Sequence, residues 1–297
     1  MKYPVMLLLS LLGYLMSAQS VERRTMIYED TLGLDLFLPA GTKDKLPLVI
    51  YVHGGGFSGG MRDSPPHLEF CERYAKRGWA SATISYHLTM KGKSFSCDQA
   101  VQNKINTLYI AAQNIHQAVA YLIKNEPVID PEKIVLAGSS AGAEAVLQAV
   151  FWKKTQQGIL PDNFQYAGLV SMAGALLDEQ WVTVATATPS LLFHGTCDPL
   201  VPYANASHHY CEADQTGFMM LYGGYSLARR LESLNQQYYL ITDCGGGHEW
   251  ASKPINKEYI KYVDDFLEND VLKGIKRQSH LVLSEGEGDC TAVEVCK

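Results

Sequence analysis

Residues 138–142 read Gly-Ser-Ser-Ala-Gly and offer a serine nucleophile on a sharp turn. They follow the apolar run 133–137 and precede the segment 143–150, which holds helix-forming residues and neither Gly nor Pro. Strand, tight turn and helix is the context in which a G-x-S-x-G motif holds its serine hydroxyl clear of a sheet. The spacing selects Ser140 rather than the serine before it, because Ala137 stands where that register would need glycine. A plain Gly/Ser-rich turn is the alternative.

An activated serine also needs a base, a carboxylate that orients the base, and donors for the developing oxyanion. After Ser140 the chain supplies a carboxylate and an imidazole in the order Ser, Asp, His. Asp198 is the predicted acid, because it follows the buried strand expected at 190–193 in a loop stiffened by prolines. An Asp that initiates a turn before proline is the alternative interpretation, and Asp178 is the second candidate for the acid.

His248 is the predicted base. It follows the strand expected at 238–242 and three consecutive glycines, which give its imidazole the reach to approach Ser140. His194, at a strand end, is expected in the core or in support of the site. Solvated positions are expected for His208 and His209, which lie in a polar stretch.

A glycine-rich loop supplies the oxyanion donors. His53 to Phe57 read His-Gly-Gly-Gly-Phe directly after the buried strand expected at 48–52. Backbone amides in such a loop can approach a substrate oxygen without obstruction. We expect Gly55 and Gly56 to donate together with the amide of Ala141, and His53 to shape the loop. A plain glycine turn is the alternative; a phosphate loop would need Lys or Ser/Thr at set offsets, which are missing.

Several neighbouring side chains carry two interpretations each. Phe57, Tyr203 and Trp250 lie in loops near the expected site and are candidates to line a substrate pocket, with ordinary packing as the alternative. Glu144 stands four residues after Ser140. A carboxylate there suits the helix N-terminus, and contact with a sugar hydroxyl is the other interpretation.

The elements that must position these residues alternate between strand and helix. Alternation predicts one doubly wound, mostly parallel α/β sheet with helices on both faces. Only residues 173–189 separate two core strands, so a large lid does not fit there. We expect a catalytic domain over 19–275. The expected strands are 25–28, 34–38, 48–52, 80–86, 133–137, 167–172, 190–193 and 238–242, and the expected helices are 66–77, 103–124, 143–150, 222–234 and 257–268.

The composition is that of an ordinary globular protein, with 297 residues, 47% hydrophobic and 19% charged. A net charge of −6 without a basic patch argues against a nucleic-acid partner. An acidic surface is also not attracted to anionic lipid, and no stable membrane insertion is expected. The oligomeric state does not follow from these features.

The two ends of the chain differ from its middle. Lys2 and the short apolar stretch 5–16, followed by small residues, are typical of a signal peptide covering 1–18. An uncleaved N-terminal anchor is the alternative. The signal peptide predicts a secreted or periplasmic protein. Residues 276–297 are polar and rich in Gly and Glu, and are expected to form a tail.

Seven cysteines suit an oxidising compartment, and their odd number leaves at least one thiol free. Cys290 and Cys296 could close a loop within the tail. Cys197 and Cys244 adjoin the expected acid and base loops and could bridge them. No CxxC pair or paired-histidine spacing supports a metal site, and none is expected.

Ser140, Asp198, His248 and the loop 53–57 together resemble the α/β-hydrolases over residues 21–273. The His-Gly-Gly-Gly form is similar to the carboxylesterase and hormone-sensitive-lipase-like branch. That resemblance implies ester hydrolysis through an acyl-enzyme, without metal or other cofactor. Two departures argue against a lipase: the missing lid, and Ala143-Glu144 where that branch often has Gly.

The overall pattern is similar to secreted bacterial esterases that remove acetyl or feruloyl groups from plant polysaccharides. Two rival functions stay open. One is an exopeptidase or oligopeptidase of the same fold, which shares the nucleophile, base and acid. The other is a secreted binding module on a silent hydrolase scaffold.

Overall fold

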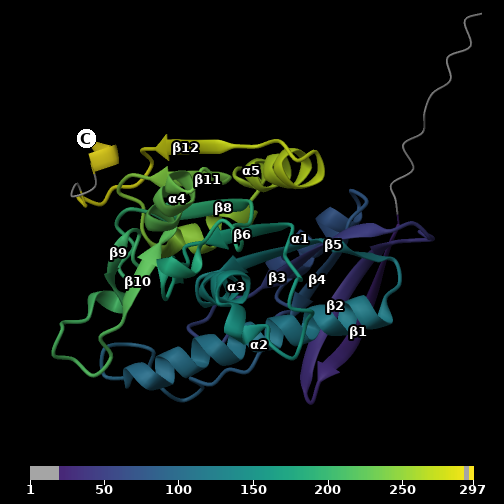
Figure 1. The fold of residues 1–297 in the computed structure, drawn as a ribbon, viewed down its shortest axis with the longest axis horizontal. Coiled ribbons are helices and arrows are strands. Elements are labelled where there is room, and N and C mark those ends of the chain that lie inside the picture. Colours follow the sequence, from purple (N-terminus) through teal and green to yellow (C-terminus); the bar gives the residue numbers. More distant parts are fainter. Residues whose placement is uncertain (1–19, 291–293) are drawn as a thin grey trace, which may run out of the picture.

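A nine-stranded sheet forms the centre of the molecule, with the strand order β1-β2-β4-β3-β5-β6-β8-β11-β12 (Figure 1). The structure, a computed structural model, describes residues 20–290 and 294–297. The signal peptide expected at 1–18 lies outside the described residues. The strands are β1 (Val21–Glu29), β2 (Leu32–Pro39), β3 (Leu46–Val52), β4 (Ala80–Ile84), β5 (Ile129–Ser139), β6 (Gly168–Met172), β8 (Ser190–Gly195), β11 (Tyr238–Asp243) and β12 (Gln278–Leu283).

Only the β1–β2 and β2–β4 pairs are antiparallel, and all other neighbours in this sheet run parallel. The predicted doubly wound, mostly parallel sheet is therefore confirmed. Its central strands are buried on both faces, which explains the continuous apolar run that forms β3. Leu48 and Ile50 enter one core cluster, whereas Val49 and Tyr51 enter the other.

Helices cover both faces of the sheet (Figure 1). Apolar residues of α2, α3 and α4 belong to one core, and those of α1 and α5 to the opposite core. Within the described part of the chain, none of the helices has both the length and the apolar character needed to cross a membrane. The helices are α1 (Pro65–Ala75), α2 (Val101–Asn125), α3 (Ala141–Phe151), α4 (Gly224–Ser233) and α5 (Ile260–Asp265), continued by a π-helix (Phe266–Leu272). Short 3₁₀ turns are Lys153–Thr155, Glu179–Trp181, His208–Tyr210, His248–Ala251, Lys253–Ile255 and Glu294–Cys296.

A second, three-stranded sheet corrects one predicted boundary. The strands β7 (Ala175–Leu176), β10 (Met220–Gly223) and β9 (Asn205–Ser207) pair antiparallel. Residues expected at the start of a helix over 222–234 therefore form the end of β10, and α4 begins at Gly224. Pairing with two neighbouring strands satisfies the backbone groups that a helix would otherwise have used.

The expected end of the domain at residue 275 was wrong. Residues Gln278–Leu283 of the expected tail form β12, which extends the sheet by pairing parallel with β11. An edge strand has one neighbour and is half-exposed, so its hydrophobic pattern is weak. The polar composition of residues 276–297 therefore did not indicate the strand β12.

Neither of the two disulfide pairings that the sequence left possible is present in the described residues. In the described residues the bridges are Cys97–Cys211, Cys197–Cys290 and Cys244–Cys296. The two tail cysteines do not bond to each other, because each faces a loop of the main sheet. The free thiol that an odd count required is the buried Cys71.

A buried carboxylate anchors the segment that follows the glycine-rich loop. Asp35 of β2 accepts hydrogen bonds from Arg23, Thr25 and Arg62. Arg62 also donates to the Ser85 hydroxyl. Because Asp35 is fully buried, its charge depends on these donors for the solvation it has lost.

We expect Asp35→Ala to lower the free energy of unfolding by about 2 kcal/mol, since it removes the buried acceptor shared by Arg23, Thr25 and Arg62. Urea denaturation followed by circular dichroism measures the change. Glu22→Ala is the control, because its ion pair with Arg24 is exposed and its loss should change stability little. Equal effects of the two substitutions would contradict the anchoring role of Asp35.

Candidate active site

Ser140 occupies a strained turn between β5 and α3, with φ 51° and ψ −123°. Its amide donates to the carbonyl of Met172 on β6. The flanking glycines are required by close backbone approach: a Cβ on Gly142 would lie 2.2 Å from the Val52 carbonyl oxygen, and one on Gly138 would lie 2.3 Å from that of Gly142. A serine held at positive φ in such a turn is typical of functional strain.

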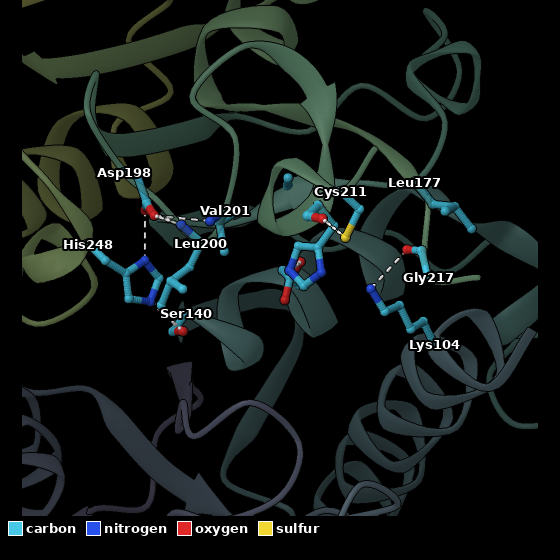
Figure 2. Close-up of polar contacts among 12 residues, drawn as sticks. Lys104, Ser140, Leu177, Asp198, Leu200, Val201, Cys211, Gly217 and His248 are labelled. Atoms are coloured by element: carbon cyan, nitrogen blue, oxygen red, sulfur yellow. Dashed lines mark hydrogen bonds and ion pairs between the residues drawn. The ribbon is translucent and has the colours of Figure 1, made fainter. Parts of the chain in front are cut away.

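The structure brings Ser140, His248 and Asp198 into one hydrogen-bonded chain (Figure 2). The Ser140 Oγ lies 2.7 Å from His248 Nε2, and His248 Nδ1 lies 2.7 Å from Asp198 Oδ2. The three residues follow β5, β11 and β8 in that order, and the carboxyl ends of parallel strands meet at one edge of a sheet. Residues up to 108 positions apart thereby share one site.

Asp198 makes the contacts expected under both interpretations of its sequence context. Its Oδ1 accepts from the amides of Leu200 and Val201, at 2.8 and 3.0 Å, and so stabilises the turn. Its Oδ2 faces His248. Figure 2 shows these contacts, all made by the one carboxylate of Asp198. A carboxylate with both oxygens paired has one fixed orientation, which in turn orients the imidazole.

A second imidazole supports this acid. The Nε2 of the fully buried His194 lies 3.5 Å from Asp198 Oδ2 and 3.1 Å from the Val201 carbonyl oxygen. Burial by itself raises the pKa of Asp198, but the hydrogen bonds from His194 and His248 outweigh it and hold the pKa well below its usual range. Asp178, the other candidate acid, instead caps a short helix by accepting from the Gln180 amide.

The environment of His248 favours its charged form. Burial lowers its pKa, but the hydrogen bond and charge of Asp198 outweigh burial, and the carboxylates of Glu144 and Glu249 add to them. The net pKa of His248 is therefore raised above 6.5. With a proton on Nδ1 donated to Asp198, Nε2 of the neutral ring is left to accept the proton of Ser140.

The glycine-rich loop lies directly against the turn that carries the serine. A Cβ on Gly54 would come within 2.9 Å of the Ser139 carbonyl oxygen and 3.1 Å of the Ser140 Cβ. Among the described residues, no acceptor pairs with the amides of Gly55, Gly56 or Ala141. The loop that adjoins the serine turn therefore carries amides that are unpaired among the described residues, and unpaired amides are what an oxyanion hole requires.

His53 contacts this loop through its ring. Its Nδ1 lies 2.7 Å from the Gly54 carbonyl oxygen, and its ring stacks on Tyr86 with 4.5 Å between ring centroids. The Tyr86 hydroxyl donates to the His53 carbonyl. Burial lowers the pKa of His53. These contacts agree with the shaping role expected for it.

The aromatic pocket candidates are packed into the core. Phe57, Tyr203 and Trp250 are all buried. The Tyr203 hydroxyl bonds to Thr242, and the Trp250 indole donates to Asp243. The packing alternative therefore describes Tyr203 and Trp250, because their polar atoms are already paired inside the protein.

The expected solvent exposure of His208 was wrong. This histidine is buried, with its Nε2 3.3 Å from an oxygen of the equally buried Glu144. The edge of its ring packs against Phe95, and its amide donates to the Met219 carbonyl. The partner of Glu144 is thus a histidine that follows β9, which neither interpretation of that carboxylate foresaw.

Asp243 is a residue that sequence reasoning missed. It ends β11 and is fully buried, with its Oδ2 2.8 Å from the Trp250 indole nitrogen. Its Oδ1 accepts from the amides of Glu285 and Gly286. Its position at the carboxyl end of a parallel strand was the available signal, since Asp198 also follows such an end.

Comparisons with known proteins agree on the fold. Residues 34–168 match the BD-FAE family model, which covers the glycine-rich loop and the serine turn. The apo form of Thermogutta terrifontis esterase 2 superposes with a TM-score of 0.60 at 18% identity, covering 86% of this chain and 96% of that chain.

Two curated relatives match by sequence over shorter stretches. Gut esterase 1 of Caenorhabditis elegans is 32% identical over 122 residues, which are 40% of this chain and 21% of the relative. Secreted lipase 5 of Gibberella zeae is 27% identical over 166 residues, which are 49% of this chain and 29% of the relative. The chain thus spans about a fifth to a third of the length of these two relatives.

We expect Asp198→Asn to lower the pKa of His248, because the substitution removes the charge that raises it while burial continues to lower it. Histidine NMR titration measures the shift. Asp178→Asn is the control and should leave the His248 resonance unchanged. An Asp198→Asn variant whose His248 titrates as in the unsubstituted protein would contradict the proposed pairing.

Proposed function

We propose that this chain is an α/β-hydrolase of the esterase type and acts as a secreted serine carboxylic-ester hydrolase that uses Ser140, His248 and Asp198. The observation that carries the proposal is the continuous hydrogen-bonded path from Ser140 Oγ through His248 to Asp198, beside unpaired backbone amides. Hydroxyl, base, acid and oxyanion donors are the full set needed for acyl transfer.

In the proposed reaction Ser140 Oγ bonds to the ester carbonyl carbon while His248 Nε2 takes its proton. The amides of Gly55, Gly56 and Ala141 receive the negative oxygen, and each such donor typically lowers the barrier by ~3 kcal/mol. Collapse breaks the bond to the alcohol oxygen, and His248 returns the proton to that oxygen. Water then attacks the acyl-enzyme by the same route and releases the acid.

We assign short acyl or feruloyl esters of plant polysaccharides as the substrate class. The BD-FAE match and the short connection between β6 and β8 support this assignment. That connection holds only β7 and a short 3₁₀ turn, so nothing inserted there covers the serine. A site without an inserted lid at this point suits an ester that is attached to a bulky polymer.

Secretion or periplasmic location is part of the proposal. Three disulfides in the described residues support it, because such bonds persist in oxidising compartments. The apolar stretch 5–16 after Lys2 provides the matching export signal. Expression with and without residues 1–18, followed by fractionation, tests this part.

We expect Ser140→Ala and His248→Ala each to lower kcat/KM for 4-nitrophenyl acetate by about 10⁶-fold, and the double variant to be no slower. The losses do not add because the two residues act as one unit. Ser139→Ala is the matched control and should retain activity, since Ser139 ends β5 one residue before the nucleophile. Additive losses would show that the two residues do not act as one unit, whereas no labelling of Ser140 by an organophosphate would favour a silent binding module.

A substrate series tests the assigned class. Acetyl, butyryl and octanoyl esters are compared with methyl ferulate, with acetylated and feruloylated xylan, and with a peptide amide. We expect the octanoyl ester and the amide to be the poorest substrates. A preference for the amide would instead identify a peptidase of the same fold.

A further inference from the structure

The loops that carry Asp198 and His248 are both bonded covalently to the C-terminal segment. Cys197, which directly precedes Asp198, forms a disulfide with Cys290. Cys244, at the start of the loop that carries His248, forms a disulfide with Cys296. Two of the three catalytic loops thus share an attachment that lies beyond the last strand of the sheet.

Backbone contacts reinforce these bonds along residues 284–290. The Gly288 amide donates to the Gly245 carbonyl at 3.0 Å. Gly286 lies so close to the same loop that a Cβ there would be 1.9 Å from the Gly246 amide nitrogen. The Tyr259 hydroxyl donates to Glu285 and adds a further contact to the segment.

Asp243 connects all three parts. Its carboxylate accepts from the amides of Glu285 and Gly286 in the segment, and from the Trp250 indole in the base loop. Its carbonyl oxygen accepts from the Thr196 amide in the acid loop. The acid and base loops also bond directly, through the Cys197 amide and the Gly246 carbonyl at 2.8 Å.

We propose that residues 284–290, together with Cys296, form a positioning element of the catalytic site that holds the Asp198 and His248 loops in register. This inference rests on the proposed function of those two residues. A loop containing three consecutive glycines has unusual backbone freedom, so the imidazole at its end needs an external restraint. Misplacing a catalytic group by 1 Å can cost about 10²-fold in rate.

A positioning role predicts a change in the titration of His248. The charged or titratable groups that face it are Asp198, Glu144 of α3, Glu249 of its own loop and His209 after β9. The contact with Asp198 raises the pKa of His248. Loosening the loops weakens this contact, so the pKa of His248 should fall toward 6.5. The acid limb of kcat/KM should therefore move to lower pH, because the neutral base persists further into acid.

The test removes each attachment separately. The variants are Cys197→Ser with Cys290→Ser, Cys244→Ser with Cys296→Ser, and Gly286→Ala. In each we expect kcat to fall by about 10²-fold with a small change in KM, and the acid limb to shift to lower pH. Substituting cysteines in bonded pairs avoids unpaired thiols that could form new bridges.

Two controls match these changes in kind. Cys97→Ser with Cys211→Ser removes a disulfide that does not attach to the tail. Gly274→Ala changes a glycine at a backbone φ of 66°, where an added Cβ would meet no atom within 4 Å. We expect Gly274→Ala to keep the kcat and the acid limb of the unsubstituted protein. The Cys97 and Cys211 double variant measures how much stability is lost when a disulfide outside the tail is removed.

The outcomes separate the two proposals. Segment variants that fold, as judged by circular dichroism, and keep the kcat and acid limb of the unsubstituted protein would overturn the positioning role alone. The positioning role would also be overturned if kcat falls only in proportion to the fraction of each variant that is unfolded. If the disulfide variants do not fold, the kcat and the acid limb of Gly286→Ala test the positioning role instead. An unsubstituted protein that neither hydrolyses esters nor reacts with an organophosphate would instead overturn the proposed function.

Discussion

The hydrogen bond between Ser140 and His248 is the contact on which the site depends. It joins a strained turn after β5 to a glycine-rich loop after β11, across three strand positions of the sheet. Parallel pairing brings both strand ends to one edge of the sheet, but the loops that follow the strands determine whether the Ser140 and His248 side chains come within hydrogen-bond distance. Gly142 lets α3 begin against the end of β3, so the serine turn and the donor loop share one backbone contact surface.

Buried carboxylates stabilise the same edge of the sheet. Asp198 follows β8 and Asp243 is the last residue of β11, and both are withdrawn from water, which would disfavour their charge if they were alone. Each is instead surrounded by donors: backbone amides and imidazoles for Asp198, and backbone amides and an indole for Asp243. The donors that replace the lost water around each carboxylate also fix its orientation. The same contacts therefore stabilise the charge and position the side chain.

The C-terminal segment connects these local arrangements. It adds β12 to the sheet edge, then crosses the base loop and bonds to the acid loop. A catalytic loop built from glycines has few side chains of its own to pack. Contacts from a distant part of the chain replace that missing packing, and the disulfides make the replacement permanent under oxidising conditions.

The sequence by itself determined the features that are encoded locally. The glycines around Ser140 and the alternation of strands and helices were readable because each follows from backbone sterics or hydrophobic period over a few residues. The order Ser, Asp, His was readable because it matches the known order of such motifs. Those same rules place Asp198 and His248 after strand ends, which is why their meeting at one edge was expected.

Only the tertiary structure decided which distant groups become neighbours. The partners of Cys197 and Cys244, the pairing of Glu144 with His208, the burial of Trp250 and the contacts of Asp243 join segments far apart in the chain. Local composition carries no information about such partners. Even β12 was concealed, because an edge strand is specified mainly by the neighbour it pairs with rather than by its own residues.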